Sequence, residues 1–212
     1  PKHYLDADFY ETNIPFDTIS LLPQDSLVIN MGYLPWHIVE LYTQLIDAMN
    51  KDDGVEILYL SAEIGHYVSD ATVPLHTCLN YNGQLTNQHG IHGLWETEIP
   101  ERANMNQLAI GIGVKPRYIL NVKAFIFSII EESYLAKDSV LILEKTLSDS
   151  FGERKYLKSN GGSYQLNKWG DKIYSDSFVR AYHNSLNGMV ERRLKRAIFS
   201  VSSLWYSAWI DS

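Results

Sequence analysis

Five histidine and carboxylate side chains in the middle of the chain have the types and the spacing of metal ligands. His66 and Asp70 are four residues apart, as are His92 and Glu96, and His76 lies between the two pairs. Residues four apart in a helix project from one face, about one turn from each other. Imidazole and carboxylate groups are the ligands that zinc and related metals prefer. The pattern predicts a metal site, with a metal-dependent hydrolase as the leading interpretation.

The first pair, taken alone, has an interpretation that needs no metal. The apolar residues that precede it at helical spacing are Val55, Tyr59 and Ala62. Because His66 and Asp70 continue this line, we expect both to point into the protein, where a buried carboxylate needs a partner. A hydrogen-bonded core pair would satisfy that need. The second pair, and His76 just after the helix-ending Pro74, favour a metal instead, since helical bundles build metal sites from inward-facing histidines and carboxylates.

The remaining histidines are weaker candidates. His3 lies close to Asp6 and Asp8 in an irregular segment, and these residues alone leave its role open. His89 belongs to a polar, turn-forming stretch at residues 80–91, and we do not expect it to bind metal. His37 and His183 are expected to be packed or surface histidines.

Composition narrows the class of protein. The 212 residues are 45% hydrophobic and 20% charged, which suits one domain spanning residues 1–212, and no apolar run is long enough to span a membrane. The single cysteine, Cys78, excludes an internal disulfide framework and a cysteine-rich zinc site. A net charge of -7 argues against a broad basic face for duplex nucleic acid. It does not exclude a phosphate substrate, since bound divalent cations add positive charge locally.

Hydrophobic periodicity predicts an all-α fold. The predicted helices cover residues 36–49, 53–70, 92–102, 118–148 and 178–208. Asp52 or Asp53 offers an N-cap for the second of them, and Pro74 stops it. The polar stretches 80–91 and 150–172 are expected to be loops, the second with a small hairpin. No alternation typical of a large sheet is present.

At its candidate ligands the sequence resembles a known family, the zinc-dependent phosphodiesterases that comprise bacterial phospholipase C and the single-strand-specific nucleases of fungi and plants. Residues 66–76 read HYVSDATVPLH, which is similar to the family's central motif, and the His-x-x-x-(Asp/Glu) motif follows at His92 to Glu96. Residues 3–6 (HYLD) match an upstream His-aromatic-x-Asp motif. The resemblance covers residues 3–96 and implies a helical phospholipase C/nuclease-type fold with long connecting loops.

The resemblance also implies a division of labour among the ligands. One complete zinc site would be formed by His76, His92 and Glu96, with a position left for water or substrate. A second zinc would be bound by His3, His66 and Asp70. Asp70 would in addition bridge to a third zinc, which makes it the expected catalytic residue.

For the substrate, the resemblance leaves two phosphodiesters in competition. In the nuclease branch the aromatic residue at the place of Tyr4 stacks on a nucleobase, and the aspartate at the place of Asp6 hydrogen-bonds it; stacking holds an unpaired base without sequence preference. Trp95 also favours a single-strand nuclease, whereas Glu96, in place of Asp, is the choice of phospholipases. We therefore expect a nuclease, with phospholipase C as the alternative. No protein partner is implied.

The chain departs from the family at its start. Family members begin with a tryptophan that binds metal, followed by a histidine and an aspartate, all well before the HYLD motif. Here only two residues precede His3, and the first is Pro1. We therefore expect that the N-terminal segment of the family is missing and that one of up to three zinc sites is complete. A secreted or periplasmic location follows from the resemblance, and a non-catalytic metal-binding domain is a further alternative.

Overall fold

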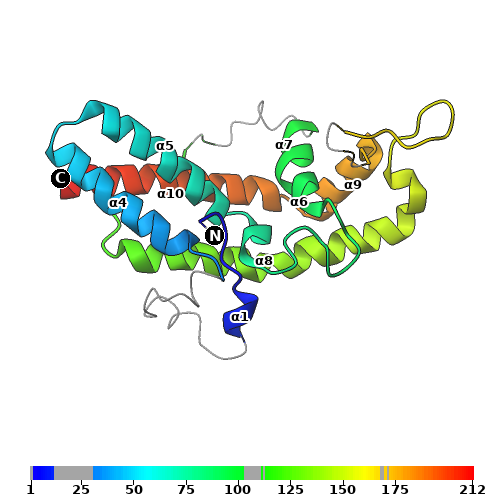
Figure 1. Ribbon diagram of the computed structural model, residues 1–212, viewed down its shortest axis with the longest axis horizontal. Coiled ribbons are helices and arrows are strands. Elements are labelled where there is room, and N and C mark those ends of the chain that lie inside the picture. The colour runs from blue at the N-terminus through cyan, green and yellow to red at the C-terminus, as the bar shows by residue number, and fades with distance from the viewer. Residues whose placement is uncertain (1, 12–30, 103–110, 112, 168–169, 171) are drawn as a thin grey trace. The chain divides into compact units, whose positions relative to one another are not determined.

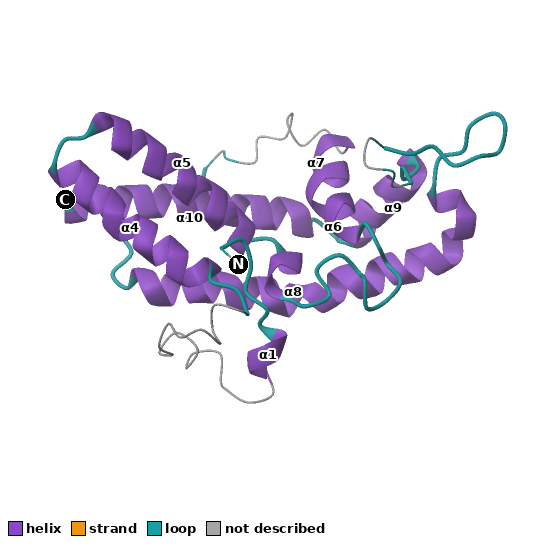
Figure 2. Cartoon of the chain, in the orientation of Figure 1, coloured by secondary structure: helices purple, strands orange, loops and turns teal. Residues whose placement is uncertain are grey.

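The computed structural model describes residues 2–11, 31–102, 111, 113–167, 170 and 172–212. Helices and turns account for the described chain, and its only β-type pairing consists of isolated bridges, so the predicted all-α class is confirmed (Figure 2). The chain divides into two compact units. The first is Pro1–Leu79, Gly111–Lys137 and Arg193–Ser212, and the second is Asn80–Ile110 and Asp138–Arg192.

Two helices that pack against each other form the part of the first unit that carries most candidate ligands (Figure 1). These are α4 (Leu34–Asn50) and α5 (Gly54–Ala71), close to their predicted ranges. The Asp53 side chain caps α5 by accepting a hydrogen bond of 3.1 Å from the backbone N–H of Glu56, as the sequence predicts. Pro74 opens the 3-10 turn η1 (Pro74–Thr77), which follows the end of α5.

Side chains from four helices form the apolar core of the first unit. Besides α4 and α5, the first part of α8 (Val122–Phe151) and the last part of α10 (Met189–Asp211) contribute to it. Its most deeply buried residues include Leu34, Ile38, Leu45, Leu60, Ile64, Val68, Ile126, Ile130 and Leu204. Ser133 of α8 donates a hydrogen bond of 2.6 Å to the carbonyl of Ala71, at the end of α5. The end of α5 is therefore fixed by a tertiary contact as well as by its own cap.

A second core forms in the other unit. The segments α6 (Ile91–Gly93), η2 (Leu94–Glu98) and α7 (Ile99–Arg102) follow one another and match the helix predicted for residues 92–102; η2 is a π-helical turn. The remaining helical parts are the end of α8, η4 (Gly152–Lys155) and α9 (Asp176–Ser185). Tyr182 of α9 is fully buried, and its hydroxyl donates a hydrogen bond of 2.9 Å to the carbonyl of Val140.

The prediction of one last helix over residues 178–208 is wrong. The chain forms α9 and α10 instead, with a break at residues 186–188. Asn187 and Gly188 have φ angles of 49° and 73°, and this left-handed conformation does not continue an α-helix. The apolar periodicity persists across the break, because both helices bury one face, and so it concealed the boundary.

The predicted inward face of α5 is also wrong. Val55 is 82% exposed and Tyr59 57% exposed, and Ala62 and His66 are exposed too. The buried residues of the helix are Leu60, Ile64, Tyr67, Val68, Asp70 and Ala71. The helix carries apolar residues on more than one face, so periodicity alone chose the wrong one. Only Asp70 of the predicted stripe is buried.

The loop predicted for residues 150–172 contains the expected hairpin-like pairing. Antiparallel bridges join three residue pairs: Tyr156 with Tyr174, Lys158 with Tyr164, and Leu166 with Lys172. A short helix, α1 (Asp8–Glu11), completes the described elements. Within the described chain no helix has the length and apolar character needed to cross a membrane.

Candidate metal centre

The segment that carries His3 runs alongside the segment that carries His76. The N–H groups of Leu5 and Ala7 donate hydrogen bonds of 3.0 Å to the carbonyls of His76 and Thr77, respectively. Leu5 and Ala7 are completely buried, so their side chains hold the segment in the core of the first unit. Backbone pairing and burial therefore fix the register of the N-terminal segment against η1.

Asp8 adds a side-chain clamp to this arrangement. Its carboxylate accepts a hydrogen bond of 2.9 Å from the hydroxyl of Tyr134 and one of 2.8 Å from the N–H of Leu79. The ammonium group of Lys137 lies 3.9 Å from the same carboxylate. One side chain thus joins the N-terminal segment, the chain after η1 and helix α8, all within the first unit.

Three predicted ligands of the first unit converge on one point. Nδ1 of His3 lies 2.9 Å from Oδ2 of Asp70, and Nε2 of His66 lies 3.2 Å from the same nitrogen and 3.5 Å from the same oxygen. A tetrahedral zinc ion with bonds of about 2.0–2.1 Å holds its ligand atoms about 3.3 Å apart. The three distances fit that edge length, so these side chains are arranged as they would be around one metal ion.

The electrostatics of this group also fit a cation. The Asp70 oxygen offers a lone pair, and each of the two imidazole nitrogens offers one in one of its tautomers. A single proton can link only two of these atoms, whereas a metal ion accepts from all three. The Asp70 side chain is 9% exposed, while those of His3 and His66 are each 54% exposed. A buried carboxylate with two solvent-accessible imidazoles leaves room for water or substrate at a bound ion.

A hydrogen bond to the backbone of the N-terminal segment orients the imidazole ring of His76. Its Nδ1 donates a hydrogen bond of 2.5 Å to the carbonyl of His3, and because a carbonyl can only accept, Nδ1 carries the proton. Nε2 is then the nitrogen with a lone pair. A backbone partner at one imidazole nitrogen is the usual way in which proteins present the other nitrogen to a metal.

The second predicted pair forms within the second unit. Nε2 of His92 lies 2.7 Å from Oε2 of Glu96, across the π-helical turn η2. Nδ1 of His92 donates to the carbonyl of Tyr81 over 3.2 Å, so a proton or a metal ion has to separate Nε2 from the carboxylate. The Asn82 side chain accepts a hydrogen bond of 3.1 Å from the N–H of Gly90, which fixes the loop before the helix.

The zinc site predicted from His76, His92 and Glu96 takes residues from both units, because His76 belongs to the first and the other two to the second. It therefore stays a prediction. What each unit supplies to it is clear: one imidazole with its Nδ1 bonded to a backbone carbonyl in the first unit, and a prepared imidazole–carboxylate pair in the second.

The expected substrate contacts, Tyr4 and Asp6, lie on the N-terminal segment and are half-buried. Burial, with a smaller contribution from the charge of Asp8, raises the pKa of Asp6 to about 6. Asp6 can therefore change its protonation state near neutral pH. Their contacts with a nucleobase stay predictions.

The three other histidines are packed or surface residues, as expected. His37 is 7% exposed and packs edge-on against Tyr67 at 4.5 Å, and burial lowers its pKa. His89 is exposed. His183 pairs with Glu191 at 2.8 Å. In the part of the chain that the structure describes, none of them joins a metal-ligand group.

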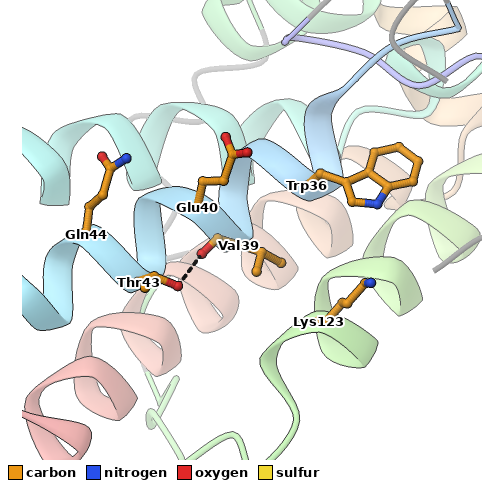
Figure 3. Close-up of a pocket in the computed structure, with 6 residues that line it drawn as sticks. All are labelled: Trp36, Val39, Glu40, Thr43, Gln44 and Lys123. Carbon is orange, nitrogen blue, oxygen red and sulfur yellow. Dashed lines mark hydrogen bonds between the residues drawn. The ribbon is translucent and has the colours of Figure 1, made fainter. Parts of the chain in front are cut away.

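Each of the two units contains a pocket. One, of about 340 Å³, lies along α4 in the first unit, with Trp36 and Lys123 at one end and Gln44 at the other (Figure 3). It contains none of the predicted site residues. The other, of about 720 Å³, lies in the second unit beside His92, and Lys172 and several tyrosines line it. Sequence reasoning missed these lining residues, although lysines and tyrosines are interleaved over residues 155–174 of an otherwise acidic chain.

Comparison with known proteins gives no match to this chain among protein-family models, curated proteins or solved structures.

Proposed function

We propose that this protein is a zinc-dependent phosphodiesterase that acts on single-stranded nucleic acid. The observation that carries the proposal is the convergence of His3, His66 and Asp70, whose ligand atoms have the separations expected around one tetrahedral ion. Two of the motifs that resemble the phosphodiesterase family supply these residues: HYLD supplies His3, and HYVSDATVPLH supplies His66 and Asp70. The His92–Glu96 pair, prepared by the carbonyl of Tyr81, would provide the core of another zinc site with His76.

The protein's own residues have clear tasks in such a reaction. Bound zinc would lower the pKa of a water molecule on the ion to about 7, and it would also bind phosphate oxygens of the substrate. Asp70, buried and in contact with two imidazoles, holds the anionic charge that a cation needs at the base of the site. The exposed edges of His3 and His66 leave the site open to a polymer substrate. Asp6, with its raised pKa, offers either a donor or an acceptor to a base edge.

A second candidate function is a zinc-dependent phospholipase C. The exposed apolar stripe of α5 favours it, because Val55, Leu58 and Tyr59 lead along the helix toward His66 and are 82%, 75% and 57% exposed. Exposed apolar side chains next to a reactive site suit a substrate that sits in a lipid surface. Single-stranded nucleic acid remains favoured by Tyr4, Asp6 and Trp95.

The test compares two substrates and two variants. The protein, loaded with zinc, is assayed on a fluorescent single-stranded oligonucleotide and on phosphatidylcholine, and bound zinc is measured by mass spectrometry. We expect cleavage of the oligonucleotide, and its loss by at least about 100-fold in Asp70→Ala, because the ligand group loses its only carboxylate. Glu63→Gln, which removes a carboxylate from the same helix, serves as the matched control and should retain activity.

The outcomes separate the alternatives. Equal activity of Asp70→Ala and the parent chain would exclude the assigned site. Turnover of phosphatidylcholine alone would establish the second candidate. Zinc bound in stoichiometric amount without turnover of either substrate would identify a metal-binding domain and reject the phosphodiesterase.

A further inference from the structure

The pocket of about 720 Å³ in the second unit has the size of a small-molecule site. One wall is the stretch before and within the His92 helix, including Tyr81 and His92, and the other is formed by described residues of the hairpin-like part of the chain, including Tyr156, Lys172 and Tyr174. The pocket thus begins at a proposed metal ligand and extends away from it along an aromatic, cationic surface. Its occupant should be able to reach His92, which lines the pocket.

Backbone hydrogen bonds join the described residues 156–167 and 172–174 before any ligand arrives. Backbone hydrogen bonds accompany the three bridges described above. The N–H of Leu157 donates a hydrogen bond of 2.8 Å to the carbonyl of Ile173, and the N–H of Ile173 donates one of 3.0 Å to the carbonyl of Gln165. The N–H of Gln165 in turn donates a hydrogen bond of 2.9 Å to the carbonyl of Leu157. These bonds tie the outward and return strands of the segment together. Lys172 and its neighbouring tyrosines therefore present a preorganised surface.

Lys172 is the positive charge that this wall offers to a ligand. Its ammonium group lies 3.9 Å from the ring centre of Tyr164 and 5.1 Å from that of Tyr156, within the range of a cation–π contact with each ring. The nearby Lys158 is instead neutralised by Glu153 at 2.7 Å. Among the described residues, Lys172 forms no ion pair. Its N–H donors are suited to an anionic oxygen such as a phosphate.

Tyr81 is the aromatic surface that this pocket leaves open. It is 54% exposed, and it meets His92 only edge-on, with ring centres 6.2 Å apart and planes at 81°. Tyr174, by contrast, stacks on Phe178 at 5.5 Å and contacts Tyr156 at 5.2 Å. The rings of Tyr156 and Tyr164 are engaged by Lys172, which also leaves little room for a second cation.

We propose that this pocket is a subsite for one nucleotide of a single strand, with the base stacked on Tyr81 and the phosphate at Lys172. The inference rests on the proposed function and deepens it, because it assigns a strand-binding role to residues outside the metal centre. A quaternary ammonium head group is a poorer fit, since the aromatic faces that would bind it already hold a lysine. A nucleotide uses both halves of the pocket, the open ring and the cation.

Binding is measured without metal, so that cleavage does not interfere. Fluorescence anisotropy follows a labelled eight-residue oligothymidylate added to the protein in EDTA, at several salt concentrations. Tyr81→Ala should weaken binding about tenfold, which is the usual loss when one base–aromatic stack is removed. Lys172→Gln should weaken it about threefold or more and reduce the salt dependence by about 0.7 in the log–log slope, as for one phosphate contact on a single strand. Lys158→Gln is the matched control on the same segment and should change neither value by more than about half as much.

Oligonucleotide binding tests the subsite whether or not the zinc-loaded protein is catalytically active. Oligonucleotide binding that Tyr81→Ala and Lys172→Gln both weaken supports the subsite, even if the zinc-loaded protein cleaves nothing. Binding equal to that of the parent chain in both variants overturns it, even if the protein is an active nuclease. Tyr81-dependent binding to phosphatidylcholine vesicles, without binding to the oligonucleotide, would overturn it in favour of a lipid surface.

Discussion

The two candidate ligand groups of this protein are built in opposite ways. His3 meets His66 and Asp70 across more than 60 positions of the sequence, and backbone pairing, burial and the Asp8 clamp bring them together. His92 and Glu96 lie on one helical segment, and their pairing needs only that segment and one loop carbonyl. The first group is a product of tertiary structure, and the second is largely local.

This difference predicts how each group responds to damage elsewhere. A ligand group assembled from distant segments loses affinity when any of the contacts that position those segments is removed. A group on one helix is insensitive to the same changes. Cadmium NMR, which gives each bound ion its own signal, can follow the two groups separately in a single sample.

The largest effect is expected from Arg193. This buried side chain donates a hydrogen bond of 2.8 Å to the carbonyl of Thr72, just after α5, and one of 3.2 Å to the carboxylate of Glu132. Arg193→Gln should lower the free energy of unfolding by about 2–4 kcal/mol, because it leaves the buried carbonyl of Thr72 without its donor and removes one of the two arginines that bind Glu132. Urea denaturation measures the loss.

Cadmium affinity at the His3 group should fall about tenfold in the same variant, since the end of α5 carries Asp70. Lys195→Gln removes an exposed cation from the same helix and serves as control, with no change expected in either quantity. A variant that unfolds at the urea concentration of the parent chain would show that this contact does not support α5.

A smaller effect is expected from the Asp8 clamp. Asp8→Asn keeps the shape of the side chain but weakens its bonds to Tyr134 and Leu79. We expect a loss of about 1–2 kcal/mol in stability and a cadmium affinity about fivefold lower at the His3 group, with no change at His92. Asp149→Asn, an exposed carboxylate of the second unit, is the matched control. Equal losses at both groups would contradict the distinction between them.

Asp6→Asn should raise the free energy of unfolding by about 1 kcal/mol at about pH 8, whereas the substitutions at Arg193 and Asp8 should lower it. The folded pKa of Asp6, about 6, lies above the ordinary value of 3.8, so the folded chain binds the proton more tightly than the unfolded chain. The stability that this proton provides is complete below about pH 4 and is lost as the pH rises through about 6.

Asn resembles the protonated carboxyl, so Asp6→Asn should be more stable than the parent chain at about pH 8 and equal to it near pH 4. Thermal unfolding in EDTA across this range measures the difference, and EDTA removes the contribution of bound metal. A variant that is less stable at about pH 8 would show that the charged form is favoured after all.

The smallest effect is expected on the local side of the comparison. Glu98 and Arg102 form an ion pair of 2.7 Å within one turn of the helix that follows His92. Glu98→Gln should cost at most about 0.5 kcal/mol, because both groups are partly exposed and such pairs contribute little. Cadmium affinity at His92 should not change by more than about twofold. A larger loss would mean that the second group also depends on its surroundings.

The sequence was sufficient for the elements whose signals are local. The cap at Asp53, the stop at Pro74 and the helix after Gly90 are each specified by a few adjacent residues, and each lies where it was predicted. The His92–Glu96 pair belongs to the same class. A spacing of four residues in a helix leaves little freedom for the two side chains.

The sequence was insufficient wherever distant segments compete. Apolar residues occur on two faces of α5, and which face is buried depends on the helices packed against it. Tyr59 is consequently 57% exposed, whereas Ile64 is completely buried. The break before α10 was missed because Asn187 and Gly188 are only two residues within an unbroken apolar pattern. The convergence of His3 on Asp70 was predicted only through resemblance, since no local rule pairs residues so far apart.

The π-helical turn at Leu94–Glu98 has a consequence for the evolution of the His92–Glu96 pair. A π turn within an α-helix is the trace of one extra residue, accommodated as a bulge without unravelling the turns on either side. Relatives of this protein that lack the extra residue should carry the same histidine and carboxylate on an uninterrupted α-helix. Aligning them would require a single gap close to Glu96. If relatives without the extra residue carry the histidine and the carboxylate, the pair arose before the insertion.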